Sequence, residues 1–144
     1  MRKLLTYFVV GALLSGCQTA DDALTTSSTP VTGPAASAIA GDMASRLAEQ
    51  IGPAGATTPI KMETDASEFA SALEAALKGR GYTVVRDGKV AKDIKPVELA
   101  YAIEGIDGQQ LARVSTPSIA LGRAYTPTAA GATPASPLSI MQRN

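Results

Sequence analysis

Apolar residues recur every four positions in the first stretch of the chain that shows a regular period. The set comprises Ile39, Met43, Leu47 and Ile51, with Ala40, Ala44 and Ala48 beside them. A spacing of this kind places all of these side chains on one broad face of an α-helix. The pattern therefore predicts an amphipathic helix with Ser37 as its N-cap and Gly52-Pro53 as its stop signal.

A second helix is predicted between two short β-like segments. Asp65 as N-cap and Glu68 three residues later resemble a capping box, and apolar residues follow at helical spacing. Those residues are Phe69, Leu73, Ala76 and Leu77. The flanking segments 59–63 and 82–86 have the composition of strands. Strand, helix and strand within about thirty residues is the βαβ spacing, so we expect the two strands to be parallel.

Alternation of apolar and other residues dominates the second half of the chain. Residues 96–104 alternate as a half-buried strand does, Asp107-Gly108 is a turn signal, and residues 109–115 form the returning strand of a hairpin. A last strand is predicted over residues 118–126, with Ile119, Leu121 and Tyr125 on one face. From Pro127 onward Thr, Ala, Gly and Pro prevail without a period, which predicts a flexible tail.

The N-terminus carries a targeting pattern. Arg2 and Lys3 precede an apolar run from Leu4 to Leu14, and the run ends in Ser15-Gly16-Cys17. This arrangement is typical of a bacterial lipobox, in which the cysteine is diacylated and becomes the first residue of the mature protein. The run is shorter than the roughly 20 residues that span a bilayer. A plain secretory signal with a chance cysteine, or a short membrane anchor, remains the alternative.

These patterns divide the chain into four parts. Residues 1–16 are a lipoprotein signal peptide, 17–36 a disordered tether rich in Thr, Ser, Ala and Pro, 37–126 a small domain, and 127–144 a flexible C-terminal tail. The domain is predicted to be α+β, with two layers, two helices and a mixed sheet. Cys17 is followed by Gln18 and not by Asp, which in a Gram-negative host indicates the outer membrane.

Composition narrows the possible chemistry. Removal of the signal peptide leaves 11 basic against 13 acidic residues, so no basic surface for nucleic acid is expected. Cys17 is the only cysteine, which excludes an internal disulfide. The chain contains no His, and so lacks His-based acid/base catalysis and His-containing zinc sites. We therefore expect no enzyme activity, no cofactor and no metal, with Cys17 as the sole site residue.

Other charged residues are weaker candidates. The pairs Glu98 with Glu104 and Asp87 with Asp93 lie at strand and turn positions that commonly face solvent, so acid/base work is not expected of them. Arg113 and Arg123 are spaced to lie on the outer face of neighbouring strands. There they would meet either a partner's carboxylate or water.

Several segments resemble the TrbH family, small lipoproteins of Trb-type conjugal transfer systems. The matching segments are 43–51, 69–82, 96–101, 115–125 and 133–138, and the clearest is Ser115-Thr116-Pro117-Ser118 through Leu121-Gly122-Arg123-Ala124-Tyr125. The resemblance implies a place in a type IV secretion apparatus, beside the TrbG and TrbI proteins of its outer-membrane core, and a role in mating-pair formation. It is also compatible with a small domain like the N0 domain of secretins.

Two functions are consistent with these features. The first is a structural and assembly lipoprotein, fixed in the outer membrane by its acyl chains, with its domain in the periplasm as part of a ring-shaped hetero-oligomer. The second is an envelope lipoprotein that binds peptidoglycan or a small ligand, which requires a pocket with convergent polar groups.

Overall fold

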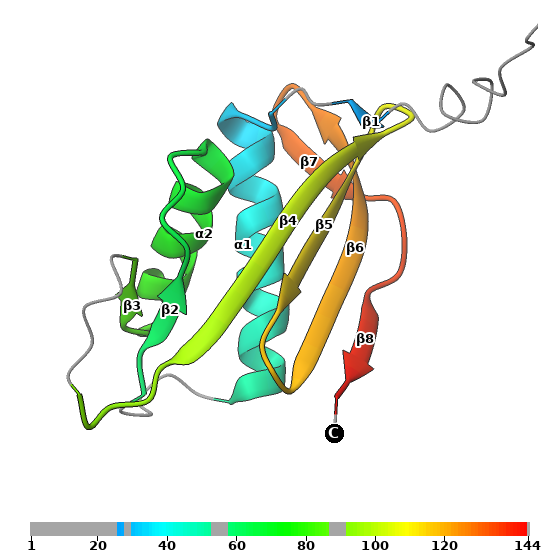
Figure 1. Ribbon diagram of the computed structural model, residues 1–144. Helices are drawn as coiled ribbons and strands as arrows, with labels where there is room; N and C mark the ends of the chain where they lie inside the picture. The colour runs from blue at the N-terminus through cyan, green and yellow to red at the C-terminus, as the bar shows by residue number, and fades with distance from the viewer. Residues whose placement is uncertain (1–25, 28–29, 53–57, 87–91, 144) are drawn as a thin grey trace, which may run out of the picture.

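The computed structural model describes residues 26–27, 30–52, 58–86 and 92–143. In this part of the chain two helices lie on one face of a mixed sheet (Figure 1), which confirms the predicted α+β class. The helices are α1 (Gly33–Ile51) and α2 (Glu68–Gly79). The strands are β1 (Thr26–Ser27), β2 (Ile60–Met62), β3 (Val84–Val85), β4 (Val97–Ile106), β5 (Gln109–Ser115), β6 (Ile119–Thr128), β7 (Gly131–Pro134) and β8 (Ser139–Gln142).

The strand order is β3-β2-β4-β5-β6-β7, with β1 beside the end of β4 and β8 beside the start of β6. β2 is parallel to β3, with Ile60 opposite Val84, so the predicted βαβ unit is confirmed. β4 and β5 form the predicted hairpin. Its turn residues Asp107 and Gly108 have φ angles of 49° and 76°, which a tight two-residue hairpin turn requires.

α1 begins five residues earlier than the sequence predicts. Thr32, and not Ser37, is the N-cap, and Pro34 lies in the first turn, where its missing N–H costs no helical hydrogen bond. A carboxylate oxygen of Glu68, at the start of α2, accepts a hydrogen bond from the backbone N–H of Gly33. Residues 33–36, which we assigned to the tether, therefore belong to the folded domain.

The cap of α2 also differs from the prediction. Ser67 is the N-cap, and its Oγ accepts a hydrogen bond from the backbone N–H of Ala70 at 3.1 Å. Asp65 lies two residues before it and accepts hydrogen bonds from both the backbone N–H and the hydroxyl of Ser67. Asp65 thus holds the capping residue in place instead of capping the helix itself.

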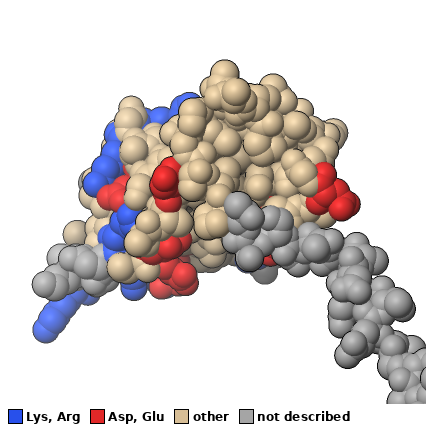
Figure 2. Space-filling model, turned by 90° about the horizontal axis from the view of Figure 1, so that it is seen from above, with Lys and Arg blue, Asp and Glu red and all other residues tan. Residues whose placement is uncertain are grey.

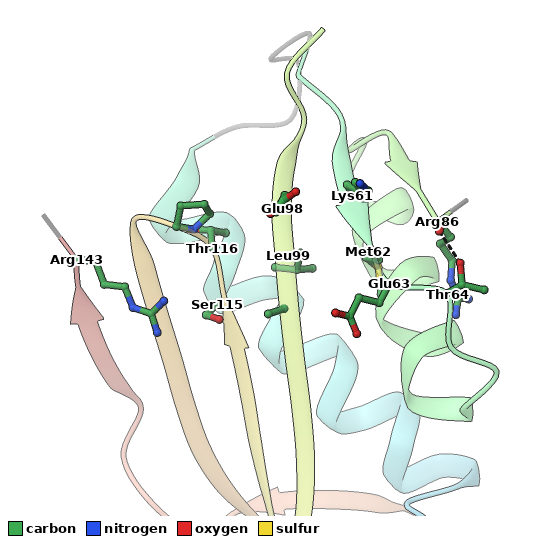
Figure 3. A pocket seen from close by; sticks show the side chains of 12 residues that line it. Lys61, Met62, Glu63, Thr64, Arg86, Glu98, Leu99, Ser115, Thr116 and Arg143 are labelled. Carbon is green, nitrogen blue, oxygen red and sulfur yellow. Dashed lines mark hydrogen bonds between the residues drawn. The ribbon is translucent and has the colours of Figure 1, made fainter. Parts of the chain in front are cut away.

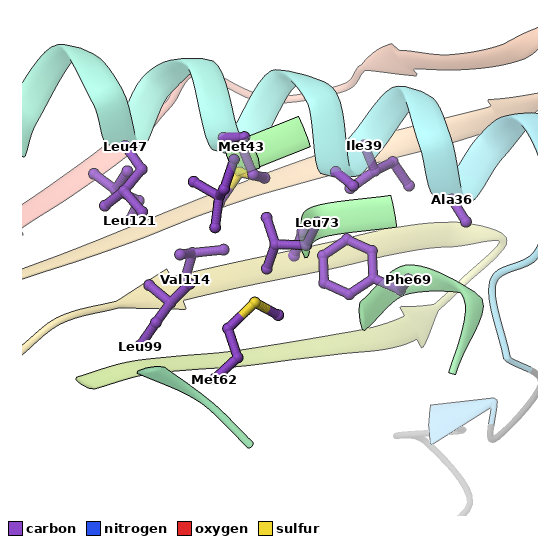
Figure 4. Packing of buried hydrophobic residues seen from close by; sticks show 14 of the residues in the cluster. Ala36, Ile39, Met43, Leu47, Met62, Phe69, Leu73, Leu99, Val114 and Leu121 are labelled. Carbon is purple, nitrogen blue, oxygen red and sulfur yellow. The ribbon is translucent and has the colours of Figure 1, made fainter. Parts of the chain in front are cut away.

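One hydrophobic core lies between the helices and the sheet (Figure 4). The predicted apolar face of α1 is buried there, as are Phe69, Leu73 and Leu77 of α2. The sheet contributes Met62, Leu99, Ala112, Val114, Ile119, Leu121 and Tyr125. Both helices therefore bury the faces that their periods indicate.

The prediction of a flexible C-terminal tail over residues 127–144 is wrong for the described residues 127–143. β6 continues to Thr128, and both β7 and β8 then pair with it in antiparallel fashion, β7 along its second half and β8 along its first. Two segments of four residues, Gly-Ala-Thr-Pro in β7 and Ser-Ile-Met-Gln in β8, become strands here because β6 supplies their hydrogen-bond partners. The folded domain extends to at least residue 142.

Gly131 lies where β7 packs closely against α1. A Cβ atom at this position would lie 3.3 Å from the Cβ of Ala38 and 3.8 Å from the carbonyl oxygen of Pro34. We expect Gly131→Val to lower the free energy of unfolding by about 1–3 kcal/mol, because the larger side chain must push the helix away. The measurement is urea unfolding followed by circular dichroism.

Gly41 provides the matched control, since a Cβ atom there would meet nothing within 4 Å. Gly41→Ala should raise stability by up to about 1 kcal/mol through helix propensity. An unchanged midpoint for Gly131→Val would show that β7 and α1 can separate at no cost.

Candidate functional site

Cys17, the one site residue that the sequence predicts, lies outside the described residues. Its acylation therefore stays a prediction. Among the residues that the structure describes, no helix has the length and apolar character needed to cross a membrane.

No helix or strand of the described residues covers the side of the sheet that faces away from the helices, and we call this side the outer sheet face. Because side chains alternate along a strand, its central residues are those between the core positions of β4, β5 and β6. They are Ala100, Ala102, Glu104, Leu111, Arg113, Ser115, Ala120, Gly122 and Ala124, which lie opposite one another in the observed register. Most are small and uncharged, so a partner can approach the backbone of the sheet closely.

Charge is unevenly distributed over the domain. Strands β5 to β8 contain no acidic residue, and Arg113 and Arg123 are their only charged side chains. In a view from above, Lys and Arg gather along one side and much of the remaining surface is uncharged (Figure 2). The sheet side of the molecule is therefore suited to contacts that depend on shape and apolar area more than on ion pairs.

A groove of about 580 Å³ lies at the end of the sheet where β4 begins. β2, β4 and the β5–β6 turn line it, and Arg143 closes it from the end of β8 (Figure 3). The charged residues on its walls have both signs: Lys61, Glu63, Arg86, Glu98 and Arg143. A polar or zwitterionic segment fits these walls better than an apolar one.

A second cavity, of about 550 Å³, lies on the other side of the same end. It shares Thr116 and Arg143 with the groove and is otherwise lined mainly by aliphatic and uncharged polar side chains from α1, β2 and β6. Sequence patterns do not predict either cavity, because their walls come from segments as distant as Lys61 and Arg143.

Arg113 and Arg123 do not share a face. Arg113 is exposed on the outer sheet face, as predicted. Arg123 faces the helices instead, where its Nη1 lies 3.1 Å from Oδ2 of Asp42 and its Nε donates to the carbonyl oxygen of Ser136. Leu121, residue 123 and Tyr125 alternate along the strand and so share one face. The sequence pattern that predicts Leu121 and Tyr125 in the core therefore also places Arg123 on the helix side.

Asp42 is the centre of a polar cluster that joins α1 to β6. The hydroxyl of the buried Tyr125 donates to Oδ2 of Asp42 at 2.6 Å, and Arg46 lies 3.5 Å from Oδ1. Burial and the neighbouring carboxylate hold the pKa of Tyr125 well above its ordinary value. The Asp42 carboxylate thus pairs with Tyr125 and Arg123 of β6, so the cluster positions the helix on the sheet.

A second polar cluster links α2 to β3 and β4. The hydroxyl of Tyr101 donates a hydrogen bond to Oδ2 of Asp65 at 3.1 Å. Burial, and after it the interaction with this carboxylate, raises the pKa of Tyr101 to about 12. Arg86 pairs with Glu74 at 3.0 Å. Hydrogen bonds and charge interactions with Lys78, and to a smaller extent with Arg86, lower the pKa of Glu74. These partners lie within the domain, and they secure α2 against the sheet.

The carboxylate pairs of the sequence analysis are not brought together as catalytic groups. Glu98 is exposed and Glu104 is half-buried on the same strand, six positions apart. Asp93 is exposed, and Asp87 lies outside the described residues. In the described part of the chain, no group of three or more His, Cys, Asp or Glu side chains is placed to hold a metal ion.

Comparisons with known proteins identify the family of this chain. A family model described as "Conjugal transfer protein TrbH" matches residues 19–144, which places the chain among proteins of conjugal transfer. A protein of Sinorhizobium fredii named "Probable conjugal transfer protein TrbH" is 78% identical over 149 residues, covering 100% of both chains. The chain belongs to the TrbH family, and the resemblance seen in the sequence is confirmed.

No solved structure matches the chain. The likeness to the N0 domain of secretins therefore stays a prediction.

Proposed function

We propose that this protein is a structural lipoprotein of the outer-membrane core of a conjugative type IV secretion system, where it supports mating-pair formation and plasmid transfer. Membership of a conjugal transfer family supports the process. The observation that carries the structural role is the outer sheet face, an uncovered surface of small side chains on a domain whose polar clusters are internally paired. Its proposed partners are core proteins of the TrbG and TrbI type.

The proposed anchor keeps the domain near the membrane. Cys17 precedes the buried Val31 by fourteen positions. Fully extended, that length of chain reaches about 50 Å at most. Short flexible linkers give effective concentrations on the order of millimolar, so a weak contact through the outer sheet face is largely occupied when its partner is also held in the envelope.

Mating frequency from a donor that lacks this gene tests the proposal. We expect wild-type protein to restore transfer, and Cys17→Ser to restore less because the domain is no longer held at the membrane. Ala102→Arg should also restore less, because it places a long cation at the centre of the outer sheet face. Ala75→Arg is its matched control, since Ala75 is exposed on α2, away from the sheet.

Three outcomes would contradict parts of the proposal. Undiminished transfer from the deletion donor would remove the role in conjugation. Full transfer with Cys17→Ser would contradict the need for the anchor. Equal transfer with Ala102→Arg and Ala75→Arg would contradict the outer sheet face as the contact surface. Protein levels in envelope fractions, compared by immunoblot, separate loss of contact from loss of the protein.

The groove beside β4 favours a second candidate function, the binding of a peptidoglycan fragment or another small polar ligand. Its volume of about 580 Å³ falls within the usual range of ligand sites, which is roughly 300–1,000 Å³. Lys61, Glu98 and Arg143 on its walls supply groups for a zwitterionic peptide. Recovery of core proteins from envelope extracts, with and without a muramyl peptide as competitor, distinguishes the two functions.

A further inference from the structure

β8 is an edge strand with exposed apolar side chains. Its only strand neighbour among the described residues is β6, so its other edge is free (Figure 1). Ile140 is 46% exposed and Met141 is 62% exposed. Met141 is the most exposed of the large hydrophobic residues in the described chain. An apolar strand with a free edge is a surface to which another strand can add.

The backbone groups on the free edge can be assigned. The N–H of Arg143 donates to the carbonyl oxygen of Ser118 at 2.9 Å, so the odd-numbered residues of β8 direct their N–H and C=O groups toward β6. In a strand these directions alternate, and the N–H and C=O groups of Ile140 and Gln142 therefore point away from β6. These two residues are the ones available for pairing.

This edge has only part of the protection that edge strands usually have. β8 contains no charged residue and no proline between Ser139 and Gln142, although it is four residues long and Arg143 follows it directly. β3, at the opposite side of the sheet, is only two residues long and is followed directly by Arg86. Short length and charge commonly protect edge strands, and β3 has both.

We propose that β8 pairs in antiparallel fashion with β8 of a second copy of this chain. Only Ile140 and Gln142 have free backbone groups, so the register that places Ile140 opposite Gln142 of the second copy forms four backbone hydrogen bonds. Met141 then faces Met141 of the second copy as a non-hydrogen-bonded pair, the closer kind of antiparallel pair. The helices of both copies lie on the same side of the joined sheet.

The chemistry of the strand favours a second copy as its occupant. In this register Arg143 lies opposite Ser139 of the second copy, so the two arginines are kept apart and no like charges face each other. Strands of four residues form a small interface, well below the roughly 1,000 Å² typical of a stable complex. Pairing therefore rests on the lipid anchor proposed above, because it depends on a high local concentration, which two copies held in one membrane would provide. It does not depend on which core protein the domain contacts.

Cysteine cross-linking of the full-length protein in the envelope of donor cells tests the pairing. In Met141→Cys the two introduced Cβ atoms are expected within the distance that a disulfide spans. After oxidation, non-reducing electrophoresis should show a product of twice the protein's mass. Ile106→Cys, at an exposed position at the far end of β4, is the control for random collision. The wild-type protein measures any contribution of Cys17.

A second pair of variants tests the hydrogen bonds of the free edge. Gln142→Pro removes an outward N–H but leaves the N–H of Arg143 bonded to β6, so it should reduce the Met141→Cys cross-link several-fold. Gln142→Ala keeps the N–H and should not reduce it. Limited proteolysis of the same extracts shows whether each variant remains folded.

The proposal is supported if Met141→Cys cross-links several-fold more than Ile106→Cys and if Gln142→Pro lowers the yield in a protein that still resists protease. A yield equal to that of Ile106→Cys overturns it. A dominant product of any other mass, which would place a different protein on this edge, also overturns it. If the Gln142→Pro variant unfolds, the cross-link yields of Met141→Cys and Ile106→Cys decide the proposal, because their comparison does not depend on Gln142→Pro.

Discussion

Leu73→Asp is expected to leave the domain unfolded at room temperature. Leu73 is completely buried, and Figure 4 shows its side chain between α1 and the sheet, near Phe69 and Met43. An aspartate there would lose the apolar contacts and place an unpaired carboxylate in the core, at a cost above about 4 kcal/mol. Small domains have about 5–15 kcal/mol of total stability, so little or none remains.

Ala75→Asp is the matched control, because Ala75 lies on the exposed side of the same helix. Its cost should be limited to helix propensity, below about 1 kcal/mol. Leu73→Ala, which removes apolar contacts without adding charge, should cost about 2–5 kcal/mol and gives a measurable transition if Leu73→Asp has none. Thermal unfolding of Leu73→Asp close to that of wild type would show that α2 does not bury this face.

Asp42→Ala should lower the free energy of unfolding by about 2–3 kcal/mol. The change removes the acceptor of the Tyr125 hydroxyl and the charge that Arg123 faces, and the side chains of both residues are largely buried. Hydrogen bonds to charged groups contribute about 1.5–3 kcal/mol, and an orphaned buried donor adds its own penalty. Urea unfolding by circular dichroism measures the loss.

Glu49→Ala is the control for Asp42→Ala, since Glu49 also pairs with Arg46 but is exposed. Exposed ion pairs contribute at most about 1 kcal/mol, so the midpoint should barely change. In a Tyr125→Phe background the hydroxyl that needs an acceptor is absent, and Asp42→Ala should then cost less. Equal costs in both backgrounds would mean that the Tyr125 hydrogen bond contributes nothing to stability.

The elements that the sequence predicts well are those whose signal is local. The four-residue period of α1, the alternation of β4 and the Asp107-Gly108 turn each arise from neighbours in sequence, and each is present in the structure. The family could likewise be inferred from short segments such as 115–125. The fold class followed from the order of these elements along the chain.

The elements that the sequence misses depend on distant partners. β7 and β8 have no period of their own, because β6 supplies their hydrogen bonds and Gly131 is the only residue of either strand that is fully buried. The start of α1 was hidden by Pro34, which fits a tether as well as a first helical turn. Of the candidate surfaces, alternation along β4 to β6 indicates the outer sheet face. The two cavities form only when segments distant in sequence, such as those of Lys61 and Arg143, come together.

The contact between α1 and β7 also determines how early in synthesis the domain can finish folding. α1 is the first helix in the described part of the chain, yet part of its buried face packs on a strand that follows about a hundred residues later. A chain that emerges from the ribosome or a translocation channel with its N-terminus first therefore exposes this helix until its last strands appear. Such long-range closure is slow and favours a chain that stays extended until late. That order would suit the export across the inner membrane that the proposed lipid anchor requires.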